Sequence, residues 1–522
     1  MKWVDGWIAL LATTSVAVWL KTPGFLFLLD YVTGPIPPPI RLDATGAISG
    51  ISVQLLSYML ASIFPPEAVT KLLILIALLI AGISTAHLCK QTSRSKIVAF
   101  SCGVFIMLNP FVFNRIFMGH IYLLFGYALM PLLLLMILRY LQLPSRTRAA
   151  WVGALSLLIM LTSIHHIILL PLAALFFVLQ YRTQFPKKVT ASEITIMLAP
   201  PIIAFIAILL IALGTSEWTG RTLQQVSPSL FALQPYCTQS TIWDTVTLSA
   251  NWRTPTITTF PCMMTPLVGI ASGALLMASV IGISSGWIGI LYVASILLAL
   301  GVSFIPGWNP MRDSGKFLET AIFAQALLLA SAAFTIRKQW LSKIFSYVLL
   351  VCVLIIAGST VQALKRSIAP APYPALWYEW NTTFAEEVEK PRVLVLPWHQ
   401  YMAFDFTNQL SVANPAPIFF TNADIISGDN IEIARNDIAV PSISQNPLSK
   451  EIESILSTKD PSDFHSRLEN LVLREGISYI LMTHSDEHEA WLREQLSSAP
   501  FVTEQHSDAT LRAWKVVQTT NQ

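Results

Sequence analysis

Long apolar runs occupy the first two thirds of the chain. A helix that crosses a bilayer needs roughly 20 mostly apolar residues, and about eleven segments of the 522-residue chain approach that pattern. Their centres lie near residues 12, 80, 104, 132, 156, 173, 203, 272, 295, 327 and 353. The pattern predicts a polytopic α-helical membrane protein. We expect the first segment to be a retained span, because Lys21-Thr22-Pro23-Gly24 follows it in place of a small-residue cleavage site.

The stretch 149–181 decides whether the number of spans is odd or even. It is too long for one span, and it is just long enough for two short helices with a hinge at residues 163–166. We expect two helices here, and therefore an odd number of spans.

A different pattern begins near residue 367. A proline-rich segment, 369–374, is followed by frequent charges and short apolar runs. Residues 392–396 and 477–482 read as buried strands, 449–456, 462–473 and 487–496 as helices, and 501–505 with 511–517 as a closing strand pair. We therefore predict a membrane domain at 1–366 and a C-terminal α/β domain at 367–522, which we call the tail. Its default role is that of a membrane-proximal recognition or lid domain.

Charge changes this picture by giving it a direction. Charged residues make up only 12% of the chain, about half the share in soluble proteins, and the net charge of +3 does not indicate a nucleic-acid partner. Basic residues without acids cluster in the alternate loops 90–96, 139–148, 182–188 and 337–343. Such loops are typically cytoplasmic. We expect a multi-pass protein of the cell membrane with a cytoplasmic N-terminus and an extracytoplasmic tail.

Two outer loops are long, 21–70 and 214–263. Within the first, residues 47–64 carry apolar side chains at helical spacing, which predicts an amphipathic helix on the outer membrane surface; a short re-entrant or packed helix is the alternative. The second loop contains Cys237 and Cys262. An oxidising compartment would allow a disulfide between them, and two free thiols are the alternative.

Ionisable residues gather at the outer ends of the predicted spans. A carboxylate can act as a general base towards a hydroxyl group, and arginine or lysine can bind a phosphate. Charges near the hydrocarbon are costly and indicate function. This combination suits attack on a sugar whose leaving group is a lipid phosphate. The candidates are Asp30, Asp43, Arg115, His120, His165, His166, Arg312, Asp313 and Lys316.

Structural roles remain open for several of these residues. Arg312 and Asp313 could pair with each other, Asp30 could cap a helix, and His165 with His166 could form a packed hinge. No pair has metal-ligand spacing on one helix, so we predict no protein metal site. A Mg²⁺ ion between an aspartate and a phosphate remains open.

The segment after the first tail strand is rich in aromatic residues. Trp398, His399 and Tyr401 follow the strand end, the place where α/β sheets bind ligands. They could stack on a sugar ring or a prenyl chain. The alternative is an aromatic cluster that seats the tail on the membrane.

With these features the chain resembles the GT-C superfamily of membrane glycosyltransferases that use polyprenyl-phosphate-linked sugars. The resemblance rests on the layout and, loosely, on the segments 109–131, 311–317 and 396–402. It implies a catalytic carboxylate in the first outer loop, Asp30 first and Asp43 second, although these acids are 13 positions apart and the paired-acid signature of the superfamily is absent. It also implies donor-phosphate binding by outer-loop residues, which fall here at Arg115, His120, Arg312 and Lys316.

The function expected from the resemblance is inverting transfer of a sugar from a polyprenyl phosphate to a glycan, glycolipid or glycoprotein acceptor. Direct displacement without a covalent intermediate is the implied mechanism. A transporter or flippase of lipid-linked saccharides is one alternative, although no internal repeat typical of transporters is evident. A non-catalytic membrane scaffold for envelope assembly, whose tail binds envelope components, is the other.

Overall fold

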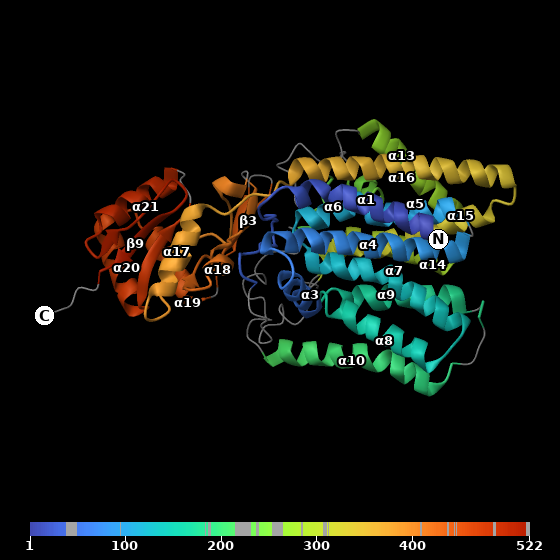
Figure 1. The fold of residues 1–522 in the computed structure, drawn as a ribbon, viewed down its shortest axis with the longest axis horizontal. Coiled ribbons are helices and arrows are strands. Elements are labelled where there is room, and N and C mark those ends of the chain that lie inside the picture. The colour runs from blue at the N-terminus through green and yellow to red at the C-terminus, as the bar shows by residue number, and fades with distance from the viewer. Residues whose placement is uncertain are drawn as a thin grey trace.

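A helix bundle and an α/β tail lie end to end in the computed structural model of this chain (Figure 1). The N-terminus lies at the end of the bundle that is far from the tail (Figure 1). The structure describes residues 1–37, 50–93, 95–182, 184–185, 189–214, 231–235, 240–252, 265–282, 286–305, 311, 313–407, 410–435, 438–442, 444, 446–483 and 487–517.

Every predicted apolar segment forms a helix, so the polytopic α-helical class is confirmed. Eight helical stretches in the described part of the chain are long and apolar enough to cross a membrane, whereas α8, α9 and α13 are shorter. The bundle helices are α1 (Lys2–Lys21), α4 (Pro66–Ser93), α5 (Lys96–Met107), α6 (Pro110–Phe117), α7 (Ile121–Gln142), α8 (Arg146–Met160), α9 (His166–Arg182), α10 (Ala191–Gly214), α13 (Thr265–Gly282), α14 (Trp287–Gly301), α15 (Leu318–Thr335) and α16 (Gln339–Ser367).

The stretch 149–181 divides into two helices, as its length predicts. α8 ends at Met160 and α9 begins at His166, and the carbonyl of Leu161 in the turn between them accepts hydrogen bonds from the backbone N–H (3.3 Å) and the hydroxyl (2.9 Å) of Ser52. Ser52 belongs to α3 (Ile51–Ala61), which lies within the predicted interfacial segment 47–64. The turn and α3 are therefore adjacent, at the end of the bundle nearer to the tail (Figure 1).

Short elements complete the membrane part. They are α12 (Thr241–Val246) and the 3-10 turns η5 (Val302–Phe304) and η7 (Ser314–Phe317). α16 then leads into the tail, and its last helical residue lies at the predicted boundary between the two parts.

The tail is built on a five-stranded sheet with the strand order β4-β1-β7-β9-β8. β1 pairs in parallel with β4 and β7, while β9 pairs antiparallel with β7 and β8. The strands and helices predicted from the sequence are present. The tail elements are α17 (Ala375–Glu386), β1 (Arg392–Leu396), β2 (Tyr401–Ala403), η8 (Asp405–Thr407), β3 (Ser411–Ala413), α18 (Ala416–Phe419), β4 (Asp424–Ile426), β5 (Ile431–Arg435), β6 (Ile438–Ser442), α19 (Pro447–Leu456), α20 (Pro461–Arg474), β7 (Ile477–Met482), α21 (Glu487–Ser498), β8 (Val502–Glu504) and β9 (Arg512–Val516).

Alternate side chains of the central strands enter two separate cores, because neighbouring residues of a strand point to opposite faces. In β1, Leu394 and Leu396 pack with residues of α19, α20 and α21. Val393 and Val395 pack on the other face with residues of α17 and α18. Both faces of the sheet are thus covered, which explains the continuous apolar character of its central strands.

Residues 25–33 of the first outer loop join the two bodies, and we call this segment the first-loop strap. Phe25 and Phe27 belong to the tail core, whereas the intervening Leu26 and Leu28 belong to the bundle core. Phe25 also exchanges backbone hydrogen bonds with Ala371, at 2.8 and 3.0 Å. Successive side chains of the strap therefore pack alternately into the tail and the bundle. This packing links the two bodies and fixes the position of Asp30.

Candidate active site

Asp30 lies in a tight turn of the first-loop strap against the end of α6. Its backbone N–H donates to the carbonyl of Met118 at 3.0 Å. Gly119 adopts a φ of 73°, and a Cβ atom there would lie 2.8 Å from the Asp30 nitrogen and 2.6 Å from the Tyr31 nitrogen. Only glycine therefore fits at this position. The Asp30 side chain remains 34% exposed, so its carboxylate is open to a ligand.

His120 connects Asp30 to the bundle. It follows α6, a helix that begins with Pro110 at its first position and with the Asn109 side chain accepting from the Val112 N–H at 3.1 Å. His120 Nε2 lies 3.0 Å from Asp30 Oδ2. Its other ring nitrogen, Nδ1, lies 2.9 Å from Nη1 of Arg115.

The Arg115 contact determines the tautomer of His120. A guanidinium group can only donate hydrogen bonds, so Nδ1 must accept and the ring proton must lie on Nε2. Nε2 therefore donates to the Asp30 carboxylate.

Arg115 is held in turn by Asp313. Its Nη1 donates to Oδ2 of Asp313 at 2.7 Å, and the Arg115 side chain is only 2% exposed. The two hydrogens of Nη1 thus have one acceptor each, Asp313 and His120. Arg115 was predicted to bind the donor phosphate, but it is buried and its Nη1 is held by Asp313 and His120, which places that nitrogen behind His120 instead.

Asp30, His120, Arg115 and Asp313 form one side of a cluster of ionisable residues. Lys316 and His165 form its other side. Lys316 is in η7 and its Nζ lies 4.0 Å from Asp313 Oδ2. It also donates to Nε2 of His165 in the turn between α8 and α9, so the His165 proton lies on Nδ1, 3.1 Å from the Ser163 hydroxyl. Burial and the nearby Lys316 charge lower the pKa of His165 well below its usual range, which leaves its ring neutral.

The two aspartates remain ionised in this environment. Burial alone would raise the pKa of Asp30, but the hydrogen bond and the charge of His120, the hydrogen bond from Tyr401 and the charge of Lys316 outweigh it, so the pKa is lowered. Burial would also raise the pKa of Asp313, and the charges of Arg115 and Lys316 likewise reverse that effect. Asp30 is therefore a carboxylate, the form required of a general base.

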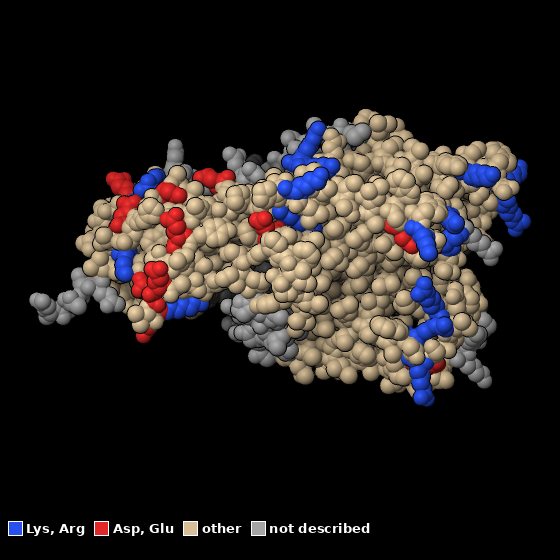
Figure 2. Space-filling model, in the orientation of Figure 1, with Lys and Arg blue, Asp and Glu red and all other residues tan. Residues whose placement is uncertain are grey.

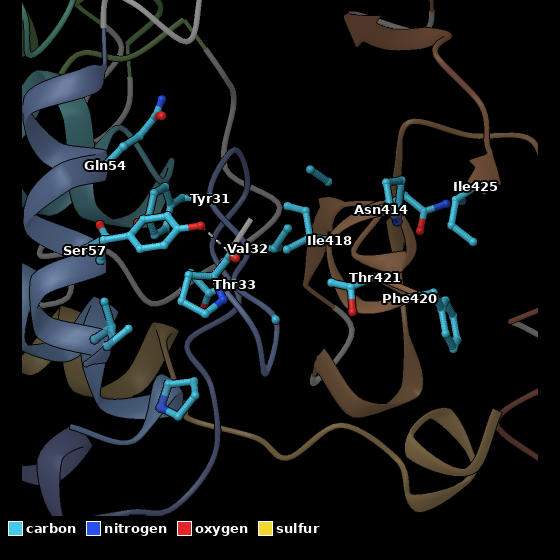
Figure 3. A pocket seen from close by; sticks show the side chains of 18 of the residues that line it. Tyr31, Val32, Thr33, Gln54, Ser57, Asn414, Ile418, Phe420, Thr421 and Ile425 are labelled. Carbon is cyan, nitrogen blue, oxygen red and sulfur yellow. Dashed lines mark hydrogen bonds between the residues drawn. The ribbon is translucent and has the colours of Figure 1, made fainter. Parts of the chain in front are cut away.

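A cavity of about 750 Å³ opens beside Asp30, between the bundle and the tail. Gln54 and Ser57 lie on its bundle side, whereas Ile418, Phe420 and Ile425 lie on its tail side (Figure 3). Both sides mix polar and apolar side chains, since Tyr31 and Val32 lie on the bundle side and Asn414 and Thr421 on the tail side. A sugar ring, with polar edges and apolar faces, matches such walls.

Helix α3 supplies part of the bundle side of the cavity. Gln54, Ser57, Tyr58 and Ala61 line it and share one face of the helix because they are three or four positions apart. The apolar side chains of Leu55 and Met59 are not among the lining residues and are exposed. The sequence predicted a helix within 47–64 but did not indicate that one of its faces would line a cavity.

The predicted site residues divide into two groups. The structure brings together Asp30, Arg115, His120, His165, Asp313, Lys316 and Tyr401. Asp43, Arg312, Cys237 and Cys262 lie outside the described residues. Tyr31 and Tyr122, which line the cavity, were missed; the only signal was that Tyr31 directly follows Asp30.

Two predicted site residues are placed elsewhere. His166 is fully buried in the bundle, where Nε2 lies 3.1 Å from Glu319 Oε1, and it fits over Gly126, whose Cβ would lie 2.0 Å from the ring. It belongs to a packed hinge. Trp398 is 5% exposed and packs in the tail core beneath α19, α20 and α21. Its ring is therefore closed to a sugar or prenyl chain, contrary to the prediction.

His399 also follows β1, and its backbone N–H donates to the Pro397 carbonyl at 3.0 Å. Its side chain is not among those that line the cavity. Across the described ranges, no three His, Cys, Asp or Glu side chains gather as metal ligands.

Comparison with known proteins identifies the fold. Neither a family model nor a curated protein matches the sequence. The structure is similar to that of the arabinofuranosyltransferase AftD from mycobacteria, with a TM-score of 0.63 and 13% identity over 98% of this chain and 40% of AftD. A mutant of AftD gives a TM-score of 0.64 and 15% identity over 99% and 42% of the two chains.

An oligosaccharyltransferase from Archaeoglobus fulgidus aligns less closely, with a TM-score of 0.44 and 12% identity over 99% of this chain and 73% of that chain. The chain spans about two fifths of the length of AftD. At this level of identity the likeness concerns the fold. The chain has the fold of this part of AftD, a membrane glycosyltransferase fold of the kind that the resemblance in sequence implied.

Proposed function

We propose that this chain is an inverting glycosyltransferase that moves a sugar from a polyprenyl-phosphate donor to an acceptor hydroxyl held in the cavity. The observation that carries the proposal is the ionised Asp30 carboxylate at the border of a 750 Å³ cavity. The GT-C fold supports the same function. Lipid and lipid-linked sugar partners follow from it, because a polyprenyl-linked donor stays in the bilayer.

The proposed reaction uses the two sides of the cluster differently. Asp30 accepts the proton of the acceptor hydroxyl, and the hydroxyl oxygen attacks the anomeric carbon. The bond from that carbon to the phosphate oxygen breaks on the opposite face, so the configuration inverts and polyprenyl phosphate leaves. Lys316, on the other side of the cluster, stabilises the negative charge of the leaving phosphate.

His120 and Arg115 serve this reaction indirectly. His120 holds one carboxylate oxygen of Asp30, and Arg115 holds the ring of His120 in the required tautomer. Neither residue needs to touch the substrate. The acceptor lies, in this proposal, between α3 and the tail, where the mixture of polar and apolar side chains suits a saccharide.

The orientation in the membrane is also part of the proposal. Several Lys and Arg side chains lie at the end of the bundle that is far from the tail, and a further group lies at the near end (Figure 2). The predicted inner loops 139–148 and 337–343 lie at the far end, because they join α7 to α8 and α15 to α16. Basic loops favour the cytoplasmic side, so we place Asp30, the cavity and the tail on the extracytoplasmic side.

A transfer assay tests the function. The protein, reconstituted in nanodiscs, is given a panel of radiolabelled polyprenyl-phosphate-linked pentoses and hexoses with saccharide acceptors, and the released polyprenyl phosphate is measured. Asp30→Asn should lower transfer by at least a hundredfold, since general bases contribute about 10²–10⁴-fold. Lys316→Met should lower kcat, because it removes stabilisation of the charge that develops on the leaving phosphate.

The control for Asp30→Asn is Asp405→Asn, a change in the tail turn η8 outside the cavity. Full transfer by Asp30→Asn would remove the proposed base. Movement of an intact lipid-linked sugar between the leaflets of vesicles, with no cleavage by the wild-type protein, would identify a transporter instead.

A further inference from the structure

The β2–β3 hairpin of the tail contacts the turn that carries Asp30. The backbone N–H of Ala413 in β3 donates to the carbonyl of Leu29 at 2.7 Å. Ala413 is the cross-strand partner of Tyr401 in β2. A hydrogen bond from the tail to the residue before Asp30 thus positions the hairpin, and with it Tyr401, beside the proposed base.

The bundle holds the same turn from the other side. The N–H groups of Leu29 and Asp30 donate to the carbonyls of Phe117 and Met118, at 3.5 and 3.0 Å. The Asp30 turn therefore lies between the end of α6 and the hairpin of the tail. Both bodies of the protein must be in place to define its conformation.

The side chain of Asp30, like its backbone, is held from both the bundle and the tail. His120, from the bundle, donates to Oδ2 at 3.0 Å. The Tyr401 hydroxyl, from the tail, forms a second hydrogen bond with the carboxylate, and it must donate because an ionised carboxylate only accepts. The other charged group that acts on Asp30 is Lys316, at longer range.

We propose that Tyr401 is a positioning residue for the general base, so that the tail completes the active site rather than serving only as a recognition or lid domain. The proposal rests on the role proposed above for Asp30. Two donors from different bodies fix the carboxylate plane, which directs its accepting lone pair into the cavity. A tail that moved away from the bundle would leave Asp30 with one donor and a free rotation.

A purely structural role for Tyr401 makes a different prediction. Packing would depend on the aromatic ring, which Tyr401→Phe retains, and would not affect the ionisation of Asp30. A positioning role depends on the hydroxyl, because hydrogen bonds to a carboxylate favour its charged form. Tyr401→Phe therefore separates the two roles without deleting the ring.

The first measurement needs no substrate. The full-length protein in nanodiscs is treated with a water-soluble carbodiimide and glycinamide across a pH series, and labelling of Asp30 is followed by peptide mass spectrometry. Only the protonated carboxyl reacts readily, so the midpoint of labelling reports its ionisation. The exposed Glu389 is the internal reference. In Tyr401→Phe the Asp30 midpoint should move to higher pH, while that of Glu389 stays unchanged.

The second measurement is transfer with the donor and acceptor pair that the wild-type protein uses in the panel. Tyr401→Phe should lower kcat by about tenfold to a hundredfold, because a hydrogen bond to the charged carboxylate is lost while Asp30 keeps its other donor. The acid limb of the kcat profile should move to higher pH with the labelling midpoint, and the donor KM should stay the same. Tyr378→Phe, on the exposed face of α17, is the matched control and should behave as wild type.

The outcomes distinguish the two proposals. If Asp30→Asn retains transfer, the role of Asp30 fails, and the positioning role of Tyr401 falls with it. If Asp30→Asn loses transfer while Tyr401→Phe matches wild type in both labelling and kcat, the role of Tyr401 alone is overturned.

Discussion

Arg115 and Asp313 form a buried ion pair, with 2.7 Å between Nη1 and Oδ2. They are 198 positions apart in the sequence and come from α6 and from the segment just before η7. The pair joins the two ends of the cluster, because Arg115 also holds His120 and Asp313 also lies near Lys316.

Breaking this pair from one side should destabilise the protein strongly. Asp313→Asn leaves the Arg115 charge buried without its counter-ion, which costs about 3–5 kcal/mol in the free energy of unfolding. Arg115→Met should cost a similar amount. The double variant Arg115→Met with Asp313→Leu should recover part of this loss, since neither charge remains. Unfolding by SDS titration in mixed micelles measures all three, and a wild-type unfolding free energy in Asp313→Asn would contradict the prediction.

Variants of His120 should separate its two hydrogen bonds. The amide nitrogen of Gln can replace Nε2 and donate to Asp30, whereas the shorter Asn can reach only towards Arg115. His120→Gln should therefore keep about a tenth of the transfer rate, and His120→Asn about a hundredth, on the scale of one or two hydrogen bonds to charged groups. The measurement is kcat in the nanodisc assay. Equal rates for the two variants would argue against the contact with Asp30.

The pH dependence of transfer should show an acid limb set by Asp30. The folded-state pKa of Asp30 is lowered from 3.8, so the active carboxylate is present above that value and is lost only as the pH falls through the lowered pKa. His165 has a lowered pKa and should add no step near pH 6.5. The kcat profile from pH 3 to 8 tests this, and a limb centred above pH 5 would contradict it.

Gly315 should not tolerate a side chain. A Cβ at this position would lie 3.0 Å from Arg115 Nη2 and 3.0 Å from Asp313 Oδ1, so Gly315→Ala must displace the ion pair. Overpacking of this kind costs about 1–3 kcal/mol, and we expect kcat to fall about tenfold because His120 loses its fixed partner. Thermal unfolding and transfer rate are the measurements.

The control for this variant is Gly358→Ala in the exposed part of α16, where no atom lies within 4 Å of the new Cβ. It should leave transfer unchanged and stabilise the helix slightly. If Gly315→Ala behaves like Gly358→Ala, the close packing around the ion pair is not needed for transfer, which would contradict the prediction.

The sequence by itself determined the elements of this protein. Three local patterns carried this information: apolar runs of span length, short apolar strands and basic loops. Each pattern depends on whether a segment lies in lipid, in a protein core or in water. For the same reason the hinge between α8 and α9 was predictable, because a mostly apolar stretch of 33 residues is too long for one straight span. The ionisable residues could be found as exceptions to an apolar background.

Only the tertiary structure decided how those residues are paired. Arg115 was expected to bind phosphate, yet Asp313 and His120 occupy its Nη1 hydrogens. Trp398 was expected to meet a ligand, yet it packs in the tail core. Tyr401 reaches Asp30 because β3 hydrogen-bonds to Leu29. Except for His120, these partners are far away in the chain, and no local pattern indicates which buried donor will meet which acceptor. That choice is made by the packing of the bundle, the first-loop strap and the tail against one another.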